Sequence, residues 1–596
     1  MPRKTDPIRR GNTKMKPFNT RKAATRQVAL AAASALAIGM SFAGAASAQT
    51  ATSTLRGVVY DGATVENGGT VTATETATGY VTRGRVGANG QYVIPGLRPG
   101  SYRIQVTTSD GQTTEDTVTL ALGQVGTLNL DVASPTTTAS TAGATDLGDI
   151  VVTGRRIFEV RTSEVATNVS QQQINDLPQI SRNFLNFAAL APGVVVQEDD
   201  AERTISAGGQ PSLAINVFID GQNQKATIID GGVAGQDDSR GNPFPQAAVQ
   251  EFRVLTQNFK AEYEQASSAI ITSVTRSGTN ELSGDLFVSW QDGRWTAQNV
   301  FSKARGEAKP KLDRLQYGGS IGGPIIEDRL HYFLAYERKD ETRERPVYLN
   351  RTEFASQFDQ YLGTFTAPFE EDMLFGKLSW QVNDRQRVDL SATYRTEQDI
   401  RDFGNGPTAY DRAVAVNGDT RSVVLKHQYQ GDRFLNEFSL DYFKSSYNPG
   451  ALNFDKTGAR YVIYRDNVPD VATNPASAGF QFSYTNIDST IFTLGGGANN
   501  QDIQQESITL RNDLTIPDVQ LAGLHTFKMG VKYSMQSYDV TKEFNRNPFY
   551  TYDIQARSEV IGSSTIPTQV SLALPVQPTS VDNNVFGIYL QDASHG

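Results

Sequence analysis

The chain has 596 residues, of which 38% are hydrophobic and 20% charged, and it contains no Cys. Several structural units are expected at this length, because domains commonly hold about 100–200 residues. The absence of Cys excludes disulfides, thiolate nucleophiles and thiolate zinc sites. A mean hydropathy of −0.39 and a single long apolar run exclude a bundle of membrane-spanning helices.

The first 48 residues have the pattern of a secretory signal peptide. Residues 1–27 hold nine Lys or Arg and one acid, and an Ala-rich apolar stretch follows from Val28. Small residues end this stretch and predict cleavage after Ala48. A membrane anchor is the alternative, but the stretch is weakly hydrophobic and no basic flank follows it. Met15 is an alternative start to Met1.

Charge and histidine content argue against nucleic acid, metal and catalysis. Removal of residues 1–48 changes the formal net charge from −9 to −17, since the leader carries nine basic residues and one acid. No basic patch remains for a nucleic-acid partner. The four His are scattered, and no nucleophile–base pair stands out. We therefore expect no metal, no cofactor and no enzymatic activity.

Residues 52–133 consist of short β-type runs separated by Gly, Asn and Pro. Within Gly90–Val106, a strand, a Pro-Gly turn and a second strand follow one another, and Tyr102 and Ile104 share one face of the second strand. This stretch resembles the carboxypeptidase regulatory-like domain, which implies a small β-sandwich. A carboxypeptidase zinc site needs a His-x-x-Glu pair, and no His here has Glu at that spacing, so peptidase activity is not expected.

Residues 134–157 form a linker that holds a candidate docking strand. Residues 134–147 are rich in Ser, Thr, Ala and Gly, as flexible linkers are. The next segment is Asp149, Ile150, Val151, Val152, Thr153 and Gly154. Such a β-branched run on a tether can add to the sheet edge of a partner. It resembles the TonB box of TonB-dependent outer-membrane receptors, which implies TonB and its inner-membrane energising complex as partners; an ordinary strand is the alternative.

Residues 158–281 resemble the plug of these receptors, especially the Oar-like branch, in which a regulatory-like module precedes the plug. Phe184, Phe187 and Leu190 recur at helical spacing, and Ala214–Gly221 has the pattern of a buried strand ending in an Asp-Gly turn. The closing Val-Thr-x-Ser-Gly-Thr-Asn element at 274–280 also matches. A free-standing α+β domain is the alternative.

Two details of this region bear on function. By analogy, the polar loop from Gln222 to Pro245 lies at the plug apex, so the candidate ligand-facing residues are Lys225, Asp237, Asp238 and Arg240. For each of them a solvated surface position is the alternative. After Ala-Glu-Tyr the family usually has Gly-rich positions, whereas this chain has Glu264, Ser267 and Ser268, which makes the local turn uncertain.

Residues 282–596 alternate between apolar and polar side chains, as in a transmembrane β-barrel. Val388, Leu390 and Tyr394 illustrate the pattern, although antiparallel soluble sheets produce the same alternation. Tyr317–Pro324 resembles a strand and turn of the Oar-like barrels. About a dozen candidate strands are present, whereas plugged transporters use about 22. With the last strand pattern starting at Val585, we expect an incomplete barrel from a C-terminally truncated or frameshifted chain.

The expected fold is therefore mainly β: a small sandwich, an α+β plug and about half of an antiparallel transmembrane barrel. The expected function is TonB-dependent uptake of a small molecule, oligosaccharide or peptide through the outer membrane of a Gram-negative bacterium, with outer-membrane lipid around the barrel. The alternatives are an exported surface binding or adhesion protein that does not transport, and a non-functional receptor fragment.

Overall fold

The computed structural model describes residues 52–133, 159–160 and 164–595, apart from positions 180, 199–202, 229–231, 237–238, 299, 301–302, 304–308, 350–353, 466–486, 498, 522, 555–564 and 575. The predicted signal peptide and the candidate docking strand at 149–154 lie outside the described residues. In the described part, no helix combines the length and apolar character needed to cross a membrane.

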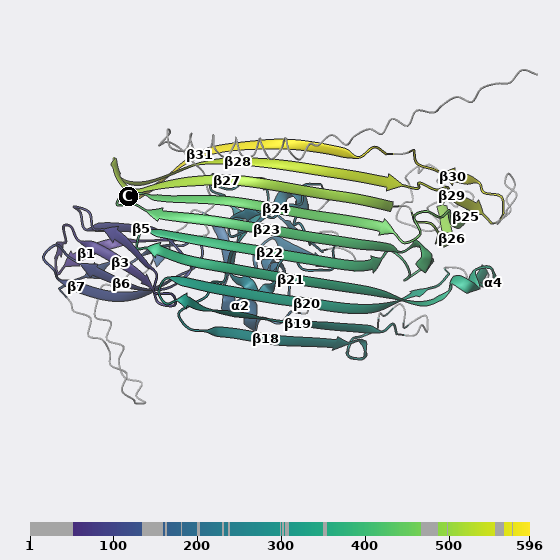
Figure 1. Ribbon diagram of the computed structural model, residues 1–596, viewed down its shortest axis with the longest axis horizontal. Helices are drawn as coiled ribbons and strands as arrows, with labels where there is room; N and C mark the ends of the chain where they lie inside the picture. Colours follow the sequence, from purple (N-terminus) through teal and green to yellow (C-terminus); the bar gives the residue numbers. More distant parts are fainter. Residues whose placement is uncertain are drawn as a thin grey trace, which may run out of the picture. The chain divides into compact units, whose positions relative to one another are not determined.

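Residues 53–133 form a two-sheet sandwich, drawn in purple in Figure 1. Alternating apolar residues of the two sheets pack together to form its core, in which Leu55, Tyr92 and Ile104 are fully buried. Its strands are β1 (Ser53–Asp61), β2 (Thr64–Val65), β3 (Thr70–Glu75), β4 (Val81–Arg85), β5 (Gln91–Leu97), β6 (Gly100–Thr107), β7 (Thr113–Leu120), β8 (Val125–Thr127) and β9 (Leu130–Asp131). β10 (Glu159–Val160), which follows the linker, pairs with β8 at the edge of this sandwich.

The segment predicted to be a plug, described from residue 164 and called the plug below, is built around a five-stranded sheet in the order β11-β16-β17-β14-β15. Its strands are β11 (Val165–Val169), β12 (Val194–Glu198), β13 (Arg203–Ala207), β14 (Ile215–Ile219), β15 (Gln222–Asn223), β16 (Val249–Gln257) and β17 (Ala269–Thr275). Its helical segments are α2 (Gln171–Asp176), η1 (Phe184–Leu190), η2 (Ser212–Ala214) and η3 (Gln246–Ala248). The predicted helix at Phe184–Leu190 is thus a 3-10 helix, whose phenylalanines pack into the plug core.

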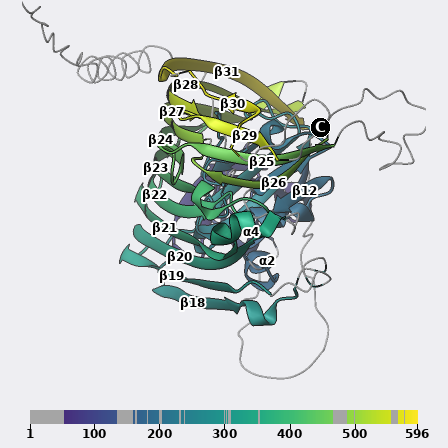
Figure 2. The same ribbon diagram turned by 90° about the vertical axis from the view of Figure 1, so that its right-hand side faces the viewer.

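Ten long antiparallel strands form a curved sheet, and the plug lies on its concave side (Figure 2). Each strand pairs with its sequence neighbour in the sheet. In sheet order they are β18 (Ser283–Asp292), β19 (Leu312–Ile326), β20 (Leu330–Val347), β21 (Gly363–Asn383), β22 (Gln386–Arg401), β23 (Val414–Gln430), β24 (Leu435–Ala451), β27 (Asn499–Leu521), β28 (Gly523–Phe544) and β31 (Thr579–His595).

The connections between these strands differ sharply at the two ends of the sheet. At one end the turns are short: 327–329, 384–385, 431–434 and the single position between Leu521 and Gly523. At the other end they are long: 293–311, 348–362, 402–413, 452–498 and 545–578. The sandwich lies at the short-turn end, next to the first three of these turns (Figure 1). Outer-membrane barrels have the same asymmetry, with short periplasmic turns and long outer loops.

The long connections build a small sheet of their own, in the order β26-β25-β29-β30. Its strands are β25 (Gly458–Arg465), β26 (Ile487–Gly495), β29 (Phe549–Asp553) and β30 (Gln569–Ser571), and the helical segments η4 (Gly293–Trp295), α4 (Ala355–Phe358), η6 (Asp359–Tyr361) and η7 (Tyr410–Arg412) belong to neighbouring loops. Phe358, Phe403 and Phe492 are buried in its core. The ten strands of the long sheet and these four loop strands together compare with about a dozen strands predicted from the sequence.

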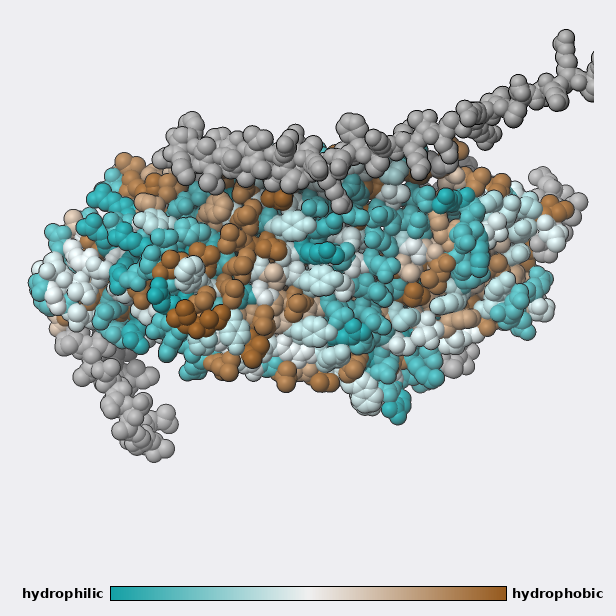
Figure 3. Space-filling view, viewed as in Figure 1, coloured by the Kyte–Doolittle hydropathy of each residue, from teal (hydrophilic) through white to brown (hydrophobic). Residues whose placement is uncertain are grey.

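The predicted alternation is confirmed along the long sheet. Outward positions carry large exposed apolar side chains, which Figure 3 shows spread across the sheet face; they include Leu286, Val288, Leu334, Leu374, Trp380, Leu390, Tyr394 and Ile588. The inward neighbours Asp389 and Ser391 are buried against the interior. The outer face therefore suits hydrocarbon and the inner face suits charged partners.

The sheet is open in the described residues, since edge strands β18 and β31 do not pair with each other. The last strand begins at Thr579, six residues before the predicted start at Val585, because its first residues extend the pairing with β28 as far as Val540.

Replacement of Leu374 by Arg tests the outer face. Leu374 lies in the middle of β21 and points outward, so Leu374→Arg should destabilise the protein in lipid vesicles by about 2–4 kcal/mol, because a charge near the bilayer midplane is poorly solvated. Urea unfolding in vesicles measures the loss. The control Leu452→Arg, at a similarly exposed position in a long loop, should change stability by less than about 1 kcal/mol. Equal losses would contradict a lipid-facing β21.

Candidate functional site

Buried ion pairs hold the plug against the inward face of the ten-stranded sheet, which is called the wall below. Arg240, in the loop before β16, pairs with Asp399 on β22 and with Glu341 on β20, the latter at 3.2 Å. All three side chains are almost fully buried. Arg240, predicted to face a ligand, instead faces the wall, because two inward-facing carboxylates need a cation there.

A second group of contacts joins the same loop to the wall. Arg395 on β22 pairs with Glu371 at 2.9 Å and with Glu397, and its Nε donates to the Asn242 carbonyl at 2.6 Å. The Asn242 amide donates to Glu371 at 2.8 Å. A Cβ at Gly241 would displace the carboxylate of Glu371 and the guanidinium of Arg395, so glycine lets this loop approach the pair without disturbing it.

The other candidate ligand-facing residues have different surroundings. The Lys225 ammonium donates to three backbone carbonyls of the plug, at 2.7, 3.2 and 2.6 Å, those of Leu213, Ile215 and Gln265. Partial burial lowers the pKa of Lys225. This side chain ties plug loops together. Asp237 and Asp238 lie outside the described residues, so their ligand-facing role stays a prediction.

The segment in which the sequence departs from the receptor pattern that it resembles is a further anchor. Glu262 pairs with Lys528, and Glu264 pairs with Lys532, both lysines lying on β28. The Glu262 pair is buried on both sides, whereas the side chain of Glu264 is 30% exposed. The unexpected glutamate at 264 thus has a structural role, since it neutralises an inward-facing lysine.

Asp220, the residue after β14, links the plug sheet to the wall. Its carboxylate accepts hydrogen bonds from the amide and hydroxyl of Thr275 at 3.1 and 2.5 Å, and Lys377 on β21 lies 3.3 Å away. Burial acts to raise the pKa of Asp220, but the charges of Lys377 and Lys426 and the Thr275 hydrogen bonds outweigh it and lower the pKa. Asp220 is therefore a charged anchor.

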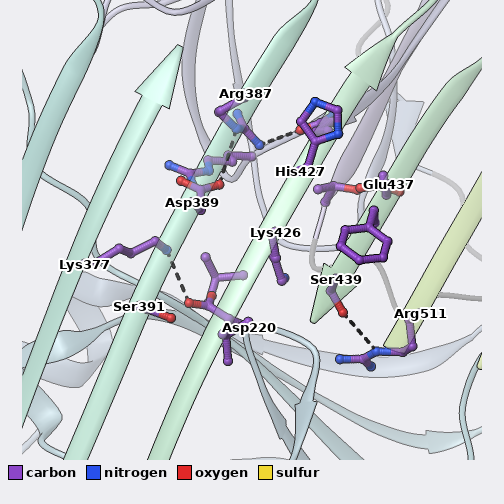
Figure 4. A pocket seen from close by; sticks show the side chains of 16 residues that line it. Asp220, Lys377, Arg387, Asp389, Ser391, Lys426, His427, Glu437, Ser439 and Arg511 are labelled. Atoms are coloured by element: carbon purple, nitrogen blue, oxygen red, sulfur yellow. Dashed lines mark hydrogen bonds and ion pairs between the residues drawn. The ribbon is translucent and has the colours of Figure 1, made fainter. Parts of the chain in front are cut away.

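A cavity of about 60 Å³ lies where the sandwich, plug and wall meet (Figure 4). Charged side chains of both signs line it, among them Arg98, Asp220, Lys377, Arg387, Asp389 and Glu437. Small-molecule pockets commonly measure about 300–1,000 Å³, whereas this volume suits a few water molecules. The cavity is therefore a small polar space in the interface between the sandwich, the plug and the wall.

The sandwich is fastened to the wall beside this cavity. Arg98, after β5, pairs with Asp389 on β22 and donates to the Ser277 hydroxyl at 3.0 Å. The Tyr80 hydroxyl donates to the carbonyl of Ser379 on β21 at 2.6 Å. Next to them, the Gln428 side chain on β23 donates to the Gly96 carbonyl at 2.9 Å. Three neighbouring barrel strands thus hold the sandwich.

The sandwich is also fastened to the plug. The Leu122 amide, between β7 and β8, donates to the Glu251 carboxylate on β16 at 3.0 Å. The Asn168 side chain on β11 donates to the Leu122 carbonyl at 3.1 Å. Burial raises the pKa of Glu251 to about 7, although hydrogen bonds from Leu122 and Asn168 act to lower it. The plug sheet and the sandwich therefore share a titratable contact.

The residues that join the sandwich to the wall could not be identified from the sequence. Arg98 and Tyr80 lie in turns of the sandwich, and no local pattern marks them as contacts to strands about 300 residues away. Inward-facing wall residues such as Lys377 and Asp389 do carry a signal, because a charge at an interior strand position needs a partner. The identity of that partner follows only from the tertiary structure.

The chain is similar to known proteins in two segments of its sequence. Residues 54–133 match the carboxypeptidase regulatory-like domain, and residues 274–352 match an outer membrane beta barrel domain. The TonB-dependent transporter Oar of Myxococcus xanthus is 25% identical over 321 residues, which cover 50% of this chain and 28% of that transporter.

The fold is similar to that of solved outer-membrane transporters. The transporter YddB from Escherichia coli superimposes with a TM-score of 0.51 at 13% identity, over 72% of this chain and 54% of that one. The ferric enterobactin receptor PfeA from Pseudomonas aeruginosa gives a TM-score of 0.45 at 14% identity, over 72% and 54%. The matched part of the chain thus covers about half the length of these two solved structures and 28% of the length of Oar.

The Glu251 contact predicts a pH-dependent plug. The unfolded chain releases the Glu251 proton near pH 4.5 and the folded chain near pH 7. Between these values the folded state binds more protons than the unfolded state, so stability falls as pH rises. Protection factors of the β16 amides, in which the intrinsic pH dependence of hydrogen exchange is divided out, should fall between pH 5 and pH 8, and Glu251→Gln should remove this fall. Exposed Glu281→Gln is the control; an unchanged pH profile in Glu251→Gln would contradict the assignment.

The two glutamates that contact β28 should differ in energetic weight. Glu262→Gln removes the buried carboxylate that contacts Lys528, whose charge also lies near Asp513 and Glu437, and should cost about 2 kcal/mol of plug stability. Glu264→Gln removes a partly exposed pair and should cost about 1 kcal/mol or less. Urea unfolding of both variants measures the difference, and equal costs would show that burial does not decide the strength of these anchors.

Proposed function

We propose that this chain, an outer-membrane relative of the TonB-dependent transporters, acts as a TonB-dependent receptor for active uptake into the periplasm. The regulatory-like sandwich, the plug and the open, plug-filled sheet occur in the order expected for the Oar-like branch. The ligand is a small molecule, an oligosaccharide or a peptide. No step requires bond chemistry at a catalytic residue.

One observation carries the proposal: both described flanks of the candidate docking strand lie at the short-turn end of the sheet. The linker leaves the sandwich after Ala133 and returns at β10, on the sandwich edge. Short turns are periplasmic in outer-membrane barrels, and TonB acts from the periplasm. Both flanks of Asp149–Gly154 thus lie on the side from which an energising partner would pull.

The opposite end of the sheet supplies the ligand-binding surface. The long loops fold into the small sheet of β25, β26, β29 and β30 around a core rich in aromatic residues. This core gives the loops a fixed arrangement, which a selective binding surface needs. Ligand would reach the plug from this side, and a partner strand added at 149–154 would transmit force to the plug.

Val151→Pro tests the coupling without knowledge of the ligand. Proline removes a backbone donor and cannot serve in the middle of a paired strand, so binding of the purified periplasmic domain of TonB to the full chain should weaken at least tenfold. Calorimetric titration measures the affinity. Ala142→Pro, in the preceding linker, is the control and should bind normally. Equal TonB affinity in the wild type and Val151→Pro would contradict the docking strand, and absence of TonB binding by the wild type would favour the non-transporting surface protein.

A further inference from the structure

The sandwich contacts the wall on one side and the first strand of the plug on the other. We propose that the sandwich is a latch: while it is seated on the barrel it holds β11 on the plug sheet, and β11 can leave only after the sandwich has moved. The part of this inference that concerns TonB rests on the proposed function, whereas the latch itself is a property of the folded chain.

β11 is the strand that needs such a latch. It lies at the edge of the plug sheet and pairs only with β16 among the described strands. A strand with one partner separates more easily than a central one, because its backbone hydrogen bonds are on one side only. β11 is also the first plug strand after the linker, so force applied to the linker reaches it before the rest of the plug.

The sandwich loop 121–124 lies directly on this strand. Asn168 of β11 donates to the Leu122 carbonyl at 3.1 Å and to the Glu251 carboxylate at 3.2 Å. Glu251 in turn accepts from the Leu122 amide. Loop, β11 and β16 thus share one buried hydrogen-bond network, and removal of the loop would leave Glu251 without its backbone donor.

The same loop reaches the point where the chain enters β11. Arg253 on β16 donates to the Gly123 carbonyl at 3.1 Å and pairs with Glu164 at 3.0 Å. The side chains of Arg253 and Glu164 are 4% and 0% exposed. Glu164 immediately precedes β11, so the first residues that a pull would move are held by a buried ion pair beneath the sandwich.

The wall contacts give the latch its fixed support. Arg98, Tyr80 and Gly96 attach the sandwich to β22, β21 and β23. These strands are central in the long sheet and cannot follow a pull on the plug. Because β10 pairs with β8, tension on the linker is applied to the sandwich before it reaches β11. The sandwich would therefore leave first and the strand second.

Two tyrosines of the sandwich provide a matched test of the latch. The hydroxyl of Tyr80 donates to Ser379 of the wall at 2.6 Å, and that of Tyr92 donates to Leu128 within the sandwich at 2.7 Å. Tyr80→Phe also removes the 2.9 Å hydrogen bond between this hydroxyl and the imidazole of His331 on β20, so it should speed hydrogen exchange of the β11 amides about tenfold through easier latch opening. Tyr92→Phe should leave β11 exchange unchanged. Equal β11 exchange in both variants would overturn the proposal.

A reversible disulfide lock gives the converse test, since the chain has no Cys. A Cβ at Gly79 of the sandwich lies 3.1 Å from the Cβ of Asp328 in a short turn of the wall, within a few tenths of an ångström of disulfide geometry. In the Gly79→Cys/Asp328→Cys protein, oxidation should slow β11 exchange about tenfold relative to the reduced form. Gly79 has a positive φ, so a Cys side chain there strains the backbone. The oxidised and reduced forms both carry this Cys, so the comparison between them removes the effect of the substitution itself.

The control lock lies within the sandwich. Ser101 and Thr119 face each other on β6 and β7, so Ser101→Cys/Thr119→Cys can close a disulfide without touching the wall. Its oxidation should not change β11 exchange. If the wall lock also leaves β11 exchange unchanged after the disulfide has formed, the latch is refuted. TonB binding is measured separately, so failure of the proposed function would leave these exchange results interpretable.

Discussion

The structure depends on one constraint: the inward face of the long sheet carries charged side chains that must be neutralised. Burial of a charge is costly unless the charge is paired, and hydrocarbon on the outer face supplies neither a counter-charge nor a hydrogen bond. Lys377, Glu371, Asp389 and Lys528 all meet this requirement through contacts with opposite charges inside the sheet. Three of these four partners come from outside the barrel strands, which explains why the interior is filled.

The partners come from two different parts of the chain, the plug and the sandwich, so the long sheet positions both parts. The plug supplies Asp220, Arg240 and Glu262, and the sandwich supplies Arg98. The polar cavity beside Asp220 and Arg98 holds space for a few waters, so charge and hydrogen bonds join the parts at this point, whereas elsewhere apolar side chains of the long sheet pack against the plug core. Such contacts can be exchanged for water when a part moves, as the proposed uptake would require.

The sequence was sufficient to predict the class of fold and the order of its parts, because alternation and turn residues are local signals. Leu390 and Tyr394 point outward, as their spacing indicated, and Tyr102 is buried in the sandwich. The site was less predictable. Arg240 has the composition of a loop residue, but its surroundings are two carboxylates from strands more than 100 residues away, and no local pattern encodes that.

Resemblance to a family and the pattern of residue types differ in what they predict about individual segments. The segment 149–154 is predicted from its β-branched run on a tether and from its resemblance to the TonB box, and it lies outside the described residues, so only its flanks bear on it. Glu264 was singled out as a departure from the family, and the structure explains it through Lys532. A departure from a family pattern is thus informative when the new residue introduces a charge, because the charge must find a partner.

The orientation of the sheet is the claim on which the rest depends, and labelling from outside the cell tests it most directly. Single cysteines can be placed at exposed Asp455 in a long loop and at exposed Asp110 in the sandwich, because the chain has no other Cys. With a membrane-impermeant maleimide on intact Gram-negative cells, the account predicts labelling at 455, and at 110 only after the outer membrane is permeabilised. Labelling at 110 but not at 455 in intact cells would contradict it.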